Sequence, residues 1–182
     1  MEPDLSKWAP WSPEEVLRRL AGVDAPWYIA AGWGIDLFLG EQRREHEDIE
    51  IAVPRARLAE FLDVFHGYEL QTISSHQTWV REPGTGLWRL DVFAEPSEGD
   101  TWVCRRDERI RLPYDQVIER TAEGIPYGSP EIILLFKAKH VRPKDESDFA
   151  AVLPQLDPDR RAWLAASLEL VHPGHRWLTA LQ

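Results

Sequence analysis

The chain has 182 residues, of which 43% are hydrophobic and 29% are charged. This length and composition predict one compact unit with an apolar core, and they exclude a disordered chain. The net charge of −10 disfavours binding to the phosphates of duplex nucleic acid, and it suits a small cationic ligand or a metal ion held by carboxylates.

The sequence also limits the compartment in which the protein is expected to work. The single cysteine, Cys104, excludes an internal disulfide and a multi-cysteine zinc site. No uncharged stretch approaches the roughly 20 residues that span a bilayer. The first residues, 1–4, lack the basic and apolar regions of a signal peptide. We therefore expect a soluble protein of the cytoplasm.

Helices and strands are expected to alternate in the first third of the chain. Ser12 is a typical helix N-cap with Glu15 three residues later, which is a capping box, and Gly22 is expected to end that helix. The remaining elements of this part are expected to be a strand over 27–31 that Gly32 and Gly34 break, a helix over 35–39 that ends at Gly40, a strand over 48–53, and a helix from Pro54 to Gly67.

Further strands are then expected, followed by helices. The order of elements predicts an α+β fold (α/β-like): a mixed β-sheet core backed by helices, with a helical C-terminal layer. We expect a core over 1–125 and a C-terminal helical segment over 126–182, packed together as one unit. The strands are expected at 68–73, 78–81, 87–93 and 101–105, and the helices at 130–141, 144–153 and from Pro158, with a short one at the end of the chain.

Two carboxylates mark the strand expected over 48–53. Because side chains two residues apart on a strand point the same way, Asp48 and Glu50 share one face, while Ile49 and Ile51 face the core. Neighbouring carboxylates repel each other unless a cation lies between them. Mg²⁺ takes carboxylate oxygens and leaves positions for water and phosphates. The pair thus predicts a magnesium site, and the alternative is a solvated strand face at a sheet edge.

A third acid, Asp91, lies in the middle of an apolar strand, where an unpaired charge is costly. If that strand lies beside 48–53 with Asp91 on the same face, three acids surround one or two metal ions. Such a centre holds the attacking and leaving oxygens during phosphoryl or nucleotidyl transfer. The turn at Gly32 and Gly34 would let backbone N–H groups approach phosphates.

These motifs together resemble the nucleotidyltransferase superfamily with a DNA polymerase β-type palm. Within it, the sequence is most similar to the aminoglycoside and lincosamide nucleotidyltransferase-like proteins. That pattern is a Gly-Gly or Gly-Ser turn, a short helix, then Thr-Arg-x-His-x-Asp-hydrophobic-Asp, and later a lone Asp on a strand. The positions that match are Gly32, Arg44, His46, Asp48, Glu50 and Asp91.

The resemblance extends over about residues 25–155. Segments 136–139 and 142–148 resemble the Lys…Arg-x-Lys-Asp-x-x-Asp segment of the helical part of these proteins. The sequence departs from the pattern at two positions, because Ala31 replaces the first glycine and Glu50 replaces the second aspartate. An alanine does not easily adopt a positive φ, and glutamate is one methylene longer than aspartate.

The resemblance implies a role for each matching residue. Asp48 and Glu50 would bind Mg²⁺ and the nucleotide triphosphate, and Asp91 would complete the site as a metal ligand and as the base for an acceptor hydroxyl. The co-substrate would be a nucleoside triphosphate, with ATP the expected one. The residues expected to bind it are Gly32, Trp33, Arg44, Lys137 and Lys144.

Some of these residues also have a purely structural interpretation. We expect His46 to brace Asp48 or the turn by a hydrogen bond, and Asp36 to cap a helix or to pair with Arg44. Lys144 is equally well explained as a surface charge. Three tryptophans, Trp33, Trp79 and Trp88, are expected in the core.

The function expected first is Mg²⁺-dependent transfer of a nucleoside monophosphate, AMP, to a hydroxyl of a small molecule. An aminoglycoside-type antibiotic is the example that the resemblance suggests, with antibiotic resistance as its consequence, and the acidic surface would attract such a cation. One alternative is a nucleotidyltransferase toxin that modifies RNA or protein, for which a local basic patch would have to offset the acidic charge, such as that of Arg105, Arg106, Arg109 and Arg111. The other is a decayed nucleotide-binding protein marked by Ala31 and Glu50. No duplex nucleic acid and no membrane is expected as a partner.

Overall fold

The computed structural model describes residues 7–182, so the first residues, on which the signal-peptide prediction rests, lie outside the described part. The described strands are β1 Tyr28–Ile29, β2 Glu50–Pro54, β3 Glu69–Ser74, β4 Gln77–Arg81, β5 Trp88–Glu95, β6 Ser97–Glu98, β7 Thr101–Val103, β8 Arg111–Pro113, β9 Ile118–Arg120 and β10 Pro126–Gly128.

Seven of these strands form one mixed sheet in the order β3-β4-β5-β2-β1-β10-β9, and β6-β7-β8 form a small antiparallel sheet. In the large sheet, β2 pairs in parallel with β5 and β1 pairs in parallel with β10, and the other pairs are antiparallel. The mixed sheet that the order of elements predicts is confirmed.

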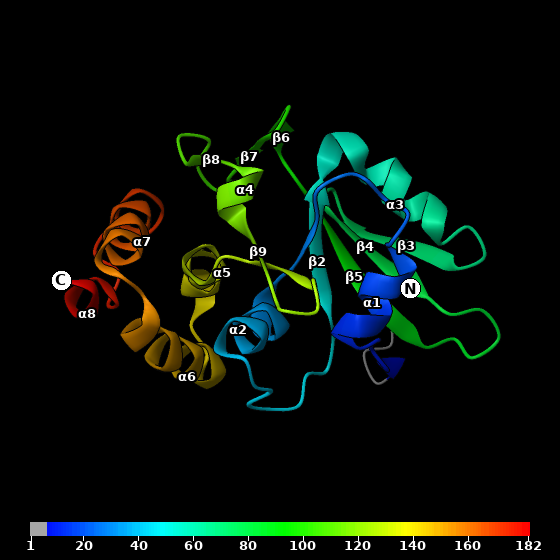
Figure 1. Ribbon diagram of the computed structural model, residues 1–182, viewed down its shortest axis with the longest axis horizontal. Helices are drawn as coiled ribbons and strands as arrows, with labels where there is room; N and C mark the ends of the chain where they lie inside the picture. The colour runs from blue at the N-terminus through cyan, green and yellow to red at the C-terminus, as the bar shows by residue number, and fades with distance from the viewer. Residues whose placement is uncertain (1–6) are drawn as a thin grey trace.

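Helices cover both faces of the large sheet. Figure 1 shows the C-terminal helices gathered on one side, and the helices over 13–19 and 58–64 on the other. The described α-helices are α1 Pro13–Arg19, α2 Ala31–Leu39, α3 Leu58–Val64, α4 Tyr114–Val117, α5 Pro130–Lys137, α6 Pro143–Val152, α7 Pro158–Val171 and α8 Leu178–Leu181, with short 3₁₀ turns at 55–57, 138–140 and 153–155.

Most predicted elements are present, with shifted ends. The Ser12 side chain accepts a hydrogen bond from the Glu15 backbone N–H, as a capping box requires, but α1 ends at Arg19 and does not continue to Gly22. Pro54 ends β2 and does not open a helix, since a 3₁₀ turn comes before α3. The helix expected over 35–39 is present as α2 and ends at Gly40 as predicted, but it begins earlier, at Ala31, so it contains both glycines that were expected to break the preceding strand.

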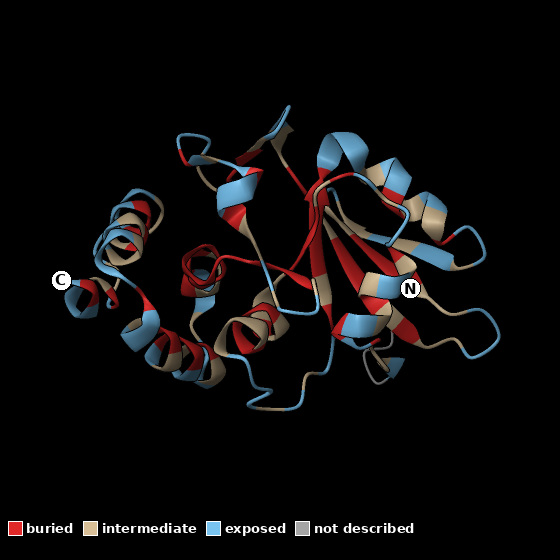
Figure 2. Ribbon diagram, viewed as in Figure 1, coloured by how far each residue is buried: buried red, intermediate tan, exposed pale blue. Residues whose placement is uncertain are grey.

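The apolar core lies on both sides of the sheet. One cluster joins the face of β2 and β5 that carries Ile51 and Val92 to Phe61 and Phe65 of the α3 region. A second cluster lies among α5, α6, α7 and α8 and reaches the other face of the sheet at Tyr28. Figure 2 shows both, with the central strands and the inner side of α5 buried. The second cluster is the helical layer that the sequence predicts.

The hairpin of β9 and β10 was not predicted. β10 lies between β1 and β9, so residues 126–128 still belong to the large sheet and the helices begin at Pro130. Ser129 is the N-cap residue of α5, but its hydroxyl donates to the carbonyls of Gln116 and Val117 and makes no capping hydrogen bond. Among residues 7–182, no helix has the length and apolar character needed to cross a bilayer.

Candidate active site

The parallel pairing of β2 with β5 determines how the predicted acids lie. Glu50 is in direct register with Asp91, so the two side chains emerge on the same face of neighbouring strands. Asp48 lies two residues before Glu50 and is exposed at the start of β2. The condition set by the sequence, that Asp91 should lie beside Glu50 on one face, is met.

Burial, together with repulsion between carboxylates, raises the pKa values of Glu50 and Asp91. Burial raises the pKa of Glu50 to about 7, and the negative charge of Asp48 adds to that rise. The pKa of Asp91 rises to about 8, first through burial and then through repulsion from Glu50. Asp48 also contributes to the rise at Asp91, so the three carboxylates form one electrostatic group.

Asp91 is held by a neighbouring strand and not by an arginine. Gln77 of β4 donates from Nε2 to Oδ2 of Asp91 over 2.7 Å. The other oxygen, Oδ1, is buried and makes no well-formed hydrogen bond, although the indole of Trp79 lies close and lowers the pKa of the carboxyl group. One oxygen of Asp91 is therefore positioned and the other remains free to accept a proton or a cation.

The three acids fit a divalent cation in their chemistry. They supply only carboxylate oxygens, which Mg²⁺ prefers, and a cation would remove the repulsion that adds to the effect of burial on the two pKa values. It would also satisfy Oδ1 of Asp91. As the side chains stand, no three His, Cys, Asp or Glu residues between 7 and 182 are gathered at metal-binding distances.

The N-terminal end of α2 lies beside the acids. The Ala30 backbone N–H donates to the Glu50 carbonyl over 2.9 Å, and α2 begins at the next residue without a side-chain cap. Ala31 has a φ of +50°, the one positive value at a non-glycine position among the described residues. This costs an L-residue on the order of 1 kcal/mol, so the turn keeps a left-handed bend although Ala31 replaces the glycine of the family pattern.

Gly32 is required by side chains that cross over the turn. A Cβ at this position would lie 2.3 Å from a guanidinium nitrogen of Arg44 and 2.7 Å from the His46 ring. His46 stacks on Trp33, with ring centroids 4.5 Å apart. Gly32 therefore admits Arg44 and His46 to the beginning of α2, which is a structural reason for glycine at this position.

The expected pairing of Asp36 with Arg44 is wrong. Asp36 accepts from His46 Nε2 over 2.6 Å and from the Arg43 backbone N–H over 3.2 Å. Arg44 instead lies 3.8 Å from Asp148 of α6. His46 is thus a brace, as expected, but its partner is Asp36 of α2 and not Asp48.

The two predicted lysines have different surroundings. Lys137 Nζ is almost buried and lies 2.9 Å from Asp145 and 3.0 Å from Asp148, so two carboxylates of α6 already neutralise its charge. It still lowers the pKa of Glu50, which shows that it lies near the acids. Lys144 is half-buried and makes no hydrogen bond or ion pair within residues 7–182.

Two adjoining cavities meet at Glu50. One of about 290 Å³, which we call the helix-end cavity, is lined by the beginning of α2 and by Trp33, Arg44, Asp48, Glu50 and Lys144. The other, of about 340 Å³, is the aromatic cavity, which extends along the sheet under α5. Ala30, Ala31, Glu50, Lys137 and Arg142 line both, so a ligand in one cavity lies next to a ligand in the other.

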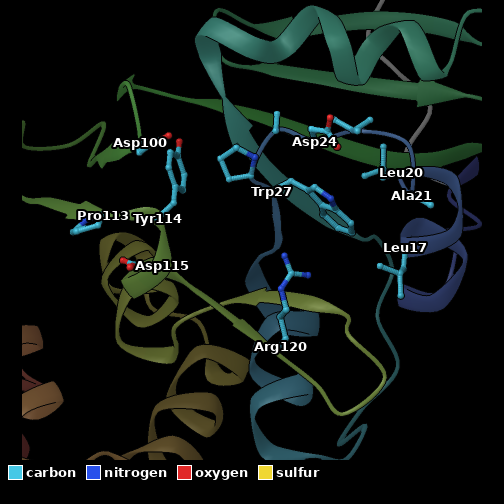
Figure 3. Close-up of a pocket in the computed structure, with 13 residues that line it drawn as sticks. Leu17, Leu20, Ala21, Asp24, Trp27, Asp100, Pro113, Tyr114, Asp115 and Arg120 are labelled. Carbon is cyan, nitrogen blue, oxygen red and sulfur yellow. The ribbon is translucent and has the colours of Figure 1, made fainter.

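A third cavity, of about 580 Å³, lies beside the segment that leads into β1 (Figure 3). Ala31 follows the other end of that strand. Trp27, Tyr114 and Arg120 line it, and it shares no lining residue with the other two cavities. None of the three predicted acids contributes to it, so its size does not make it the site of the expected chemistry.

Two residues that belong to this region were missed from the sequence. Gln77 was not predicted because only the pairing of β4 with β5 brings it to Asp91. Arg105 was noted only as part of a basic patch, but it pairs with Glu95 inside the aromatic cavity. Trp79 and Trp88 are buried as expected, while Trp33 is half-buried and lines the helix-end cavity.

The chain matches a family model described as aminoglycoside-2''-adenylyltransferase over residues 14–94, the part that holds Gly32 and the three acids. No curated protein matches the sequence.

Several solved structures share the fold. The crystal structure of ANT(2'')-Ia in complex with adenylyl-2''-tobramycin has a TM-score of 0.62 and 21% identity, over 86% of this chain and 95% of that one. The lincomycin-bound lincosamide antibiotic adenylyltransferase LnuA has a TM-score of 0.60 and 17% identity, over 76% of this chain and 92% of that one.

A third structure, an antigenic nucleotidyltransferase-like protein from Paracoccidioides brasiliensis, has a TM-score of 0.52 and 20% identity, over 95% of this chain and 94% of that one. At these identities the structures show a common fold. The family model shows in addition a similarity of sequence in the N-terminal half of this chain. The chain thus shares the fold of these adenylyltransferases, and its residues 14–94 are similar in sequence to the aminoglycoside-2''-adenylyltransferase family, in agreement with the resemblance that the motifs predict.

Proposed function

We propose that this protein transfers a nucleoside monophosphate, AMP, from a nucleoside triphosphate to a hydroxyl group of a small molecule, with Mg²⁺ as the metal. The observation that carries the proposal is the register of Glu50 with Asp91, which sets two carboxylates side by side with a third, Asp48, close enough to repel them. Such a group is unfavourable without a cation, and its chemistry suits a magnesium-bound triphosphate.

The helix-end cavity is the proposed place of the triphosphate. The free backbone N–H groups at the beginning of α2 and the helix dipole favour an anion there. Lys144, which has no other partner in the described part of the chain, and Arg44 line the same cavity. The positive charges of Lys144 and Arg44 would attract phosphate oxygens. Asp48 and Glu50, which line the same cavity, would hold the metal ion.

The reaction would then proceed at the boundary of the two cavities. The acceptor oxygen attacks the α-phosphorus, the new O–P bond forms, and the bond to the pyrophosphate oxygen breaks as pyrophosphate leaves. Asp91, with Oδ2 held by Gln77, takes the proton of the acceptor hydroxyl. The bound Mg²⁺ would neutralise phosphate charge in this step.

The decayed-site alternative finds less support in the geometry. Ala31 adopts the left-handed conformation for which the family uses glycine, and Glu50 remains in register with Asp91. Both departures from the family pattern are thus accommodated by the surrounding backbone.

Calorimetry with ATP and with GTP, each with and without Mg²⁺, tests the proposal. We expect binding that requires the metal and that falls at least tenfold in Asp48→Asn, because loss of a ligand leaves phosphate repulsion uncompensated. Asp63→Asn, a substitution of an exposed residue of α3, is the matched control and should bind normally. A protein that binds neither nucleotide under any metal condition would contradict the proposal.

Transfer itself is measured with nucleotide labelled at the α-phosphate and a panel of acceptors. Tobramycin and lincomycin belong in the panel because the similar structures contain them or the adenylylated form, and tRNA tests the toxin alternative. Label on a small hydroxyl compound supports the proposal. Label that appears only on RNA rejects it.

A further inference from the structure

The charges around the aromatic cavity differ from those of the protein as a whole. The chain carries a net charge of −10, but only two carboxylates line this cavity, Glu50 and Glu95. Five permanently basic side chains line it as well: Arg105, Arg106, Lys137, Lys139 and Arg142. The lining is therefore locally basic on an acidic protein.

Both carboxylates already have a role, one in an ion pair and the other in the proposed metal site. Glu95 is almost fully buried and forms an ion pair with Arg105. The Arg105 guanidinium lies 5.1 Å from the ring centre of Phe93 and 4.7 Å from that of Phe136, so packing fixes the pair from both sides. Glu50 lies beside Asp91 and is assigned to the metal ion in the proposed function. With the metal ion bound at Glu50, an ammonium group that entered this cavity would find no carboxylate left to pair with.

The basic side chains are not all neutralised in this way. Lys137 and Arg142 pair with Asp145. Arg106 donates to the carbonyls of Leu135 and Phe136 and pairs with no carboxylate in the described residues. Lys139 is exposed at the edge of the cavity and makes no ion pair or hydrogen bond within 7–182. Two positive charges therefore remain available.

Apart from His140, the rest of the lining is apolar. Tyr28, Ile132 and Phe136 face the cavity, with Ala52 and Phe93 on the sheet below. Such a lining suits a ring or hydrocarbon group. The volume of about 340 Å³ is in the range of sites for small molecules.

We propose that the aromatic cavity holds the acceptor and selects a hydroxyl compound with an apolar ring and an anionic group, such as a carboxylate or phosphate, over a polycation. This inference rests on the proposed function, because it takes the helix-end cavity for the triphosphate. The nucleoside half of ATP has no negative charge to set against Arg106 and Lys139, whereas an anionic acceptor does. The acidic surface would attract a cation to the protein, but the cavity would not retain it.

A matched series of three compounds tests this selection by calorimetry on the whole protein. Phenyl β-glucoside, 4-carboxyphenyl β-glucoside and 4-(aminomethyl)phenyl β-glucoside have the same sugar hydroxyls and ring and differ in charge. We expect the carboxylate to bind most tightly and the ammonium at least tenfold more weakly than the carboxylate, since like charges in a confined site repel. Tightest binding by the ammonium compound would overturn the inference.

A pair of lysine variants identifies the charge responsible. Lys139→Gln should weaken the carboxylate compound about two- to fivefold, the range of an exposed ion pair, and leave the neutral compound unchanged. Lys7→Gln replaces another exposed lysine and should change neither. Equal weakening of the neutral and anionic compounds by Lys139→Gln would contradict a charge-selective role.

The ATP measurements separate this inference from the proposed function. If Mg-ATP does not bind, the proposed function fails, while the charge series still reports on the cavity. A different result is that Mg-ATP binds and competes with the glucosides, and that Lys139→Gln weakens ATP binding by the same factor as binding of the carboxylate compound. In that case the aromatic cavity holds the nucleoside, so this inference fails while the proposed function stands. ATP affinity that Lys139→Gln leaves unchanged supports the acceptor assignment.

Discussion

Strands β2 and β5 present two faces with opposite chemistry, one apolar and one acidic, and successive residues of each strand belong to different faces. On one face Ile51 and Val53 of β2 lie with Leu90 and Val92 of β5, each at most 1% exposed. On the other, Glu50 lies beside Asp91, and both have raised pKa values. Because neighbouring side chains on a strand point to opposite faces, stability and chemistry are assigned to alternate residues of the same two strands.

This comparison implies that the two faces respond in opposite ways to substitution. Loss of an apolar side chain should lower the free energy of unfolding without any direct effect on the reaction. Loss of a carboxylate should stop the reaction without a loss of stability, because the acids repel each other and are costly to bury.

The largest expected effect is that of Asp91→Asn on transfer. We expect the rate of AMP transfer to fall on the order of 10³-fold, since the proposed base is lost, while the melting temperature stays the same or rises. Radiolabel transfer and thermal denaturation measure the two. A variant that keeps its transfer rate would remove Asp91 from the mechanism, and a marked fall in melting temperature would show that Asp91 stabilises the fold.

The opposite face is tested by Leu90→Ala, one residue away. Leu90 is fully buried, so its truncation should lower the free energy of unfolding by about 2–5 kcal/mol, as measured in urea. Leu70→Ala, at a leucine that is 42% exposed on β3, is the control and should change it by less than about 0.5 kcal/mol. Similar values for both variants would show that the β5 core face is not tightly packed.

The acid face should also make stability depend on pH in the absence of metal. The pKa values of Glu50 and Asp91 are raised to about 7 and about 8, so between pH 4 and pH 8 the folded state binds more protons than the unfolded state. Stability should therefore fall as pH rises through this range, on the order of 5 kcal/mol between pH 5.5 and 8.5 for the two acids together.

Denaturant titration at several pH values measures this fall, and comparison with the double variant Glu50→Gln/Asp91→Asn isolates the contribution of the two acids. Added Mg²⁺ should restore more stability at pH 8.5 than at pH 5.5, since it binds the ionised carboxylates. A wild-type profile that coincides with that of the double variant would refute the proposed repulsion.

The smallest effect is expected where the acid face meets α2. Ala31→Gly should stabilise the protein by about 1 kcal/mol, because glycine adopts the positive φ of this position without strain. Ala30→Gly, one residue earlier at an ordinary extended φ of −107°, should give no gain. Equal changes in melting temperature for the two variants would show that Ala31 is not strained.

The sequence was informative where short-range patterns decide the structure. Alternation along 48–53 and around Asp91 predicted which side chains share a face, and the family resemblance predicted that the two strands meet. The Ser12 capping box and the left-handed C-cap at Gly40, with a φ of +77°, also follow from local chemistry.

The residues that escaped prediction depend on contacts between distant segments. Gln77 reaches Asp91 only through the register of β4 with β5. Glu95, at the end of β5, meets Arg105 only because the chain folds back through β6 and β7. The partner of Asp36 depends on how the loop after Gly40 folds back over α2, which local sequence does not specify. The three-residue strands β9 and β10 are too short for a periodic signal and exist because β1 offers β10 a partner.

The central claim, that Asp48, Glu50 and Asp91 form one cation site, is tested most directly by Mn²⁺ binding. Mn²⁺ takes the same oxygen ligands as Mg²⁺, and its electron paramagnetic resonance signal reports the free ion during a titration in the presence of ATP. We predict that wild-type protein binds Mn²⁺ with ATP and that Asp91→Asn weakens this binding at least tenfold. Equal Mn²⁺ affinity in the two proteins would contradict the claim, because the acid on β5 would then be no part of the site formed at β2.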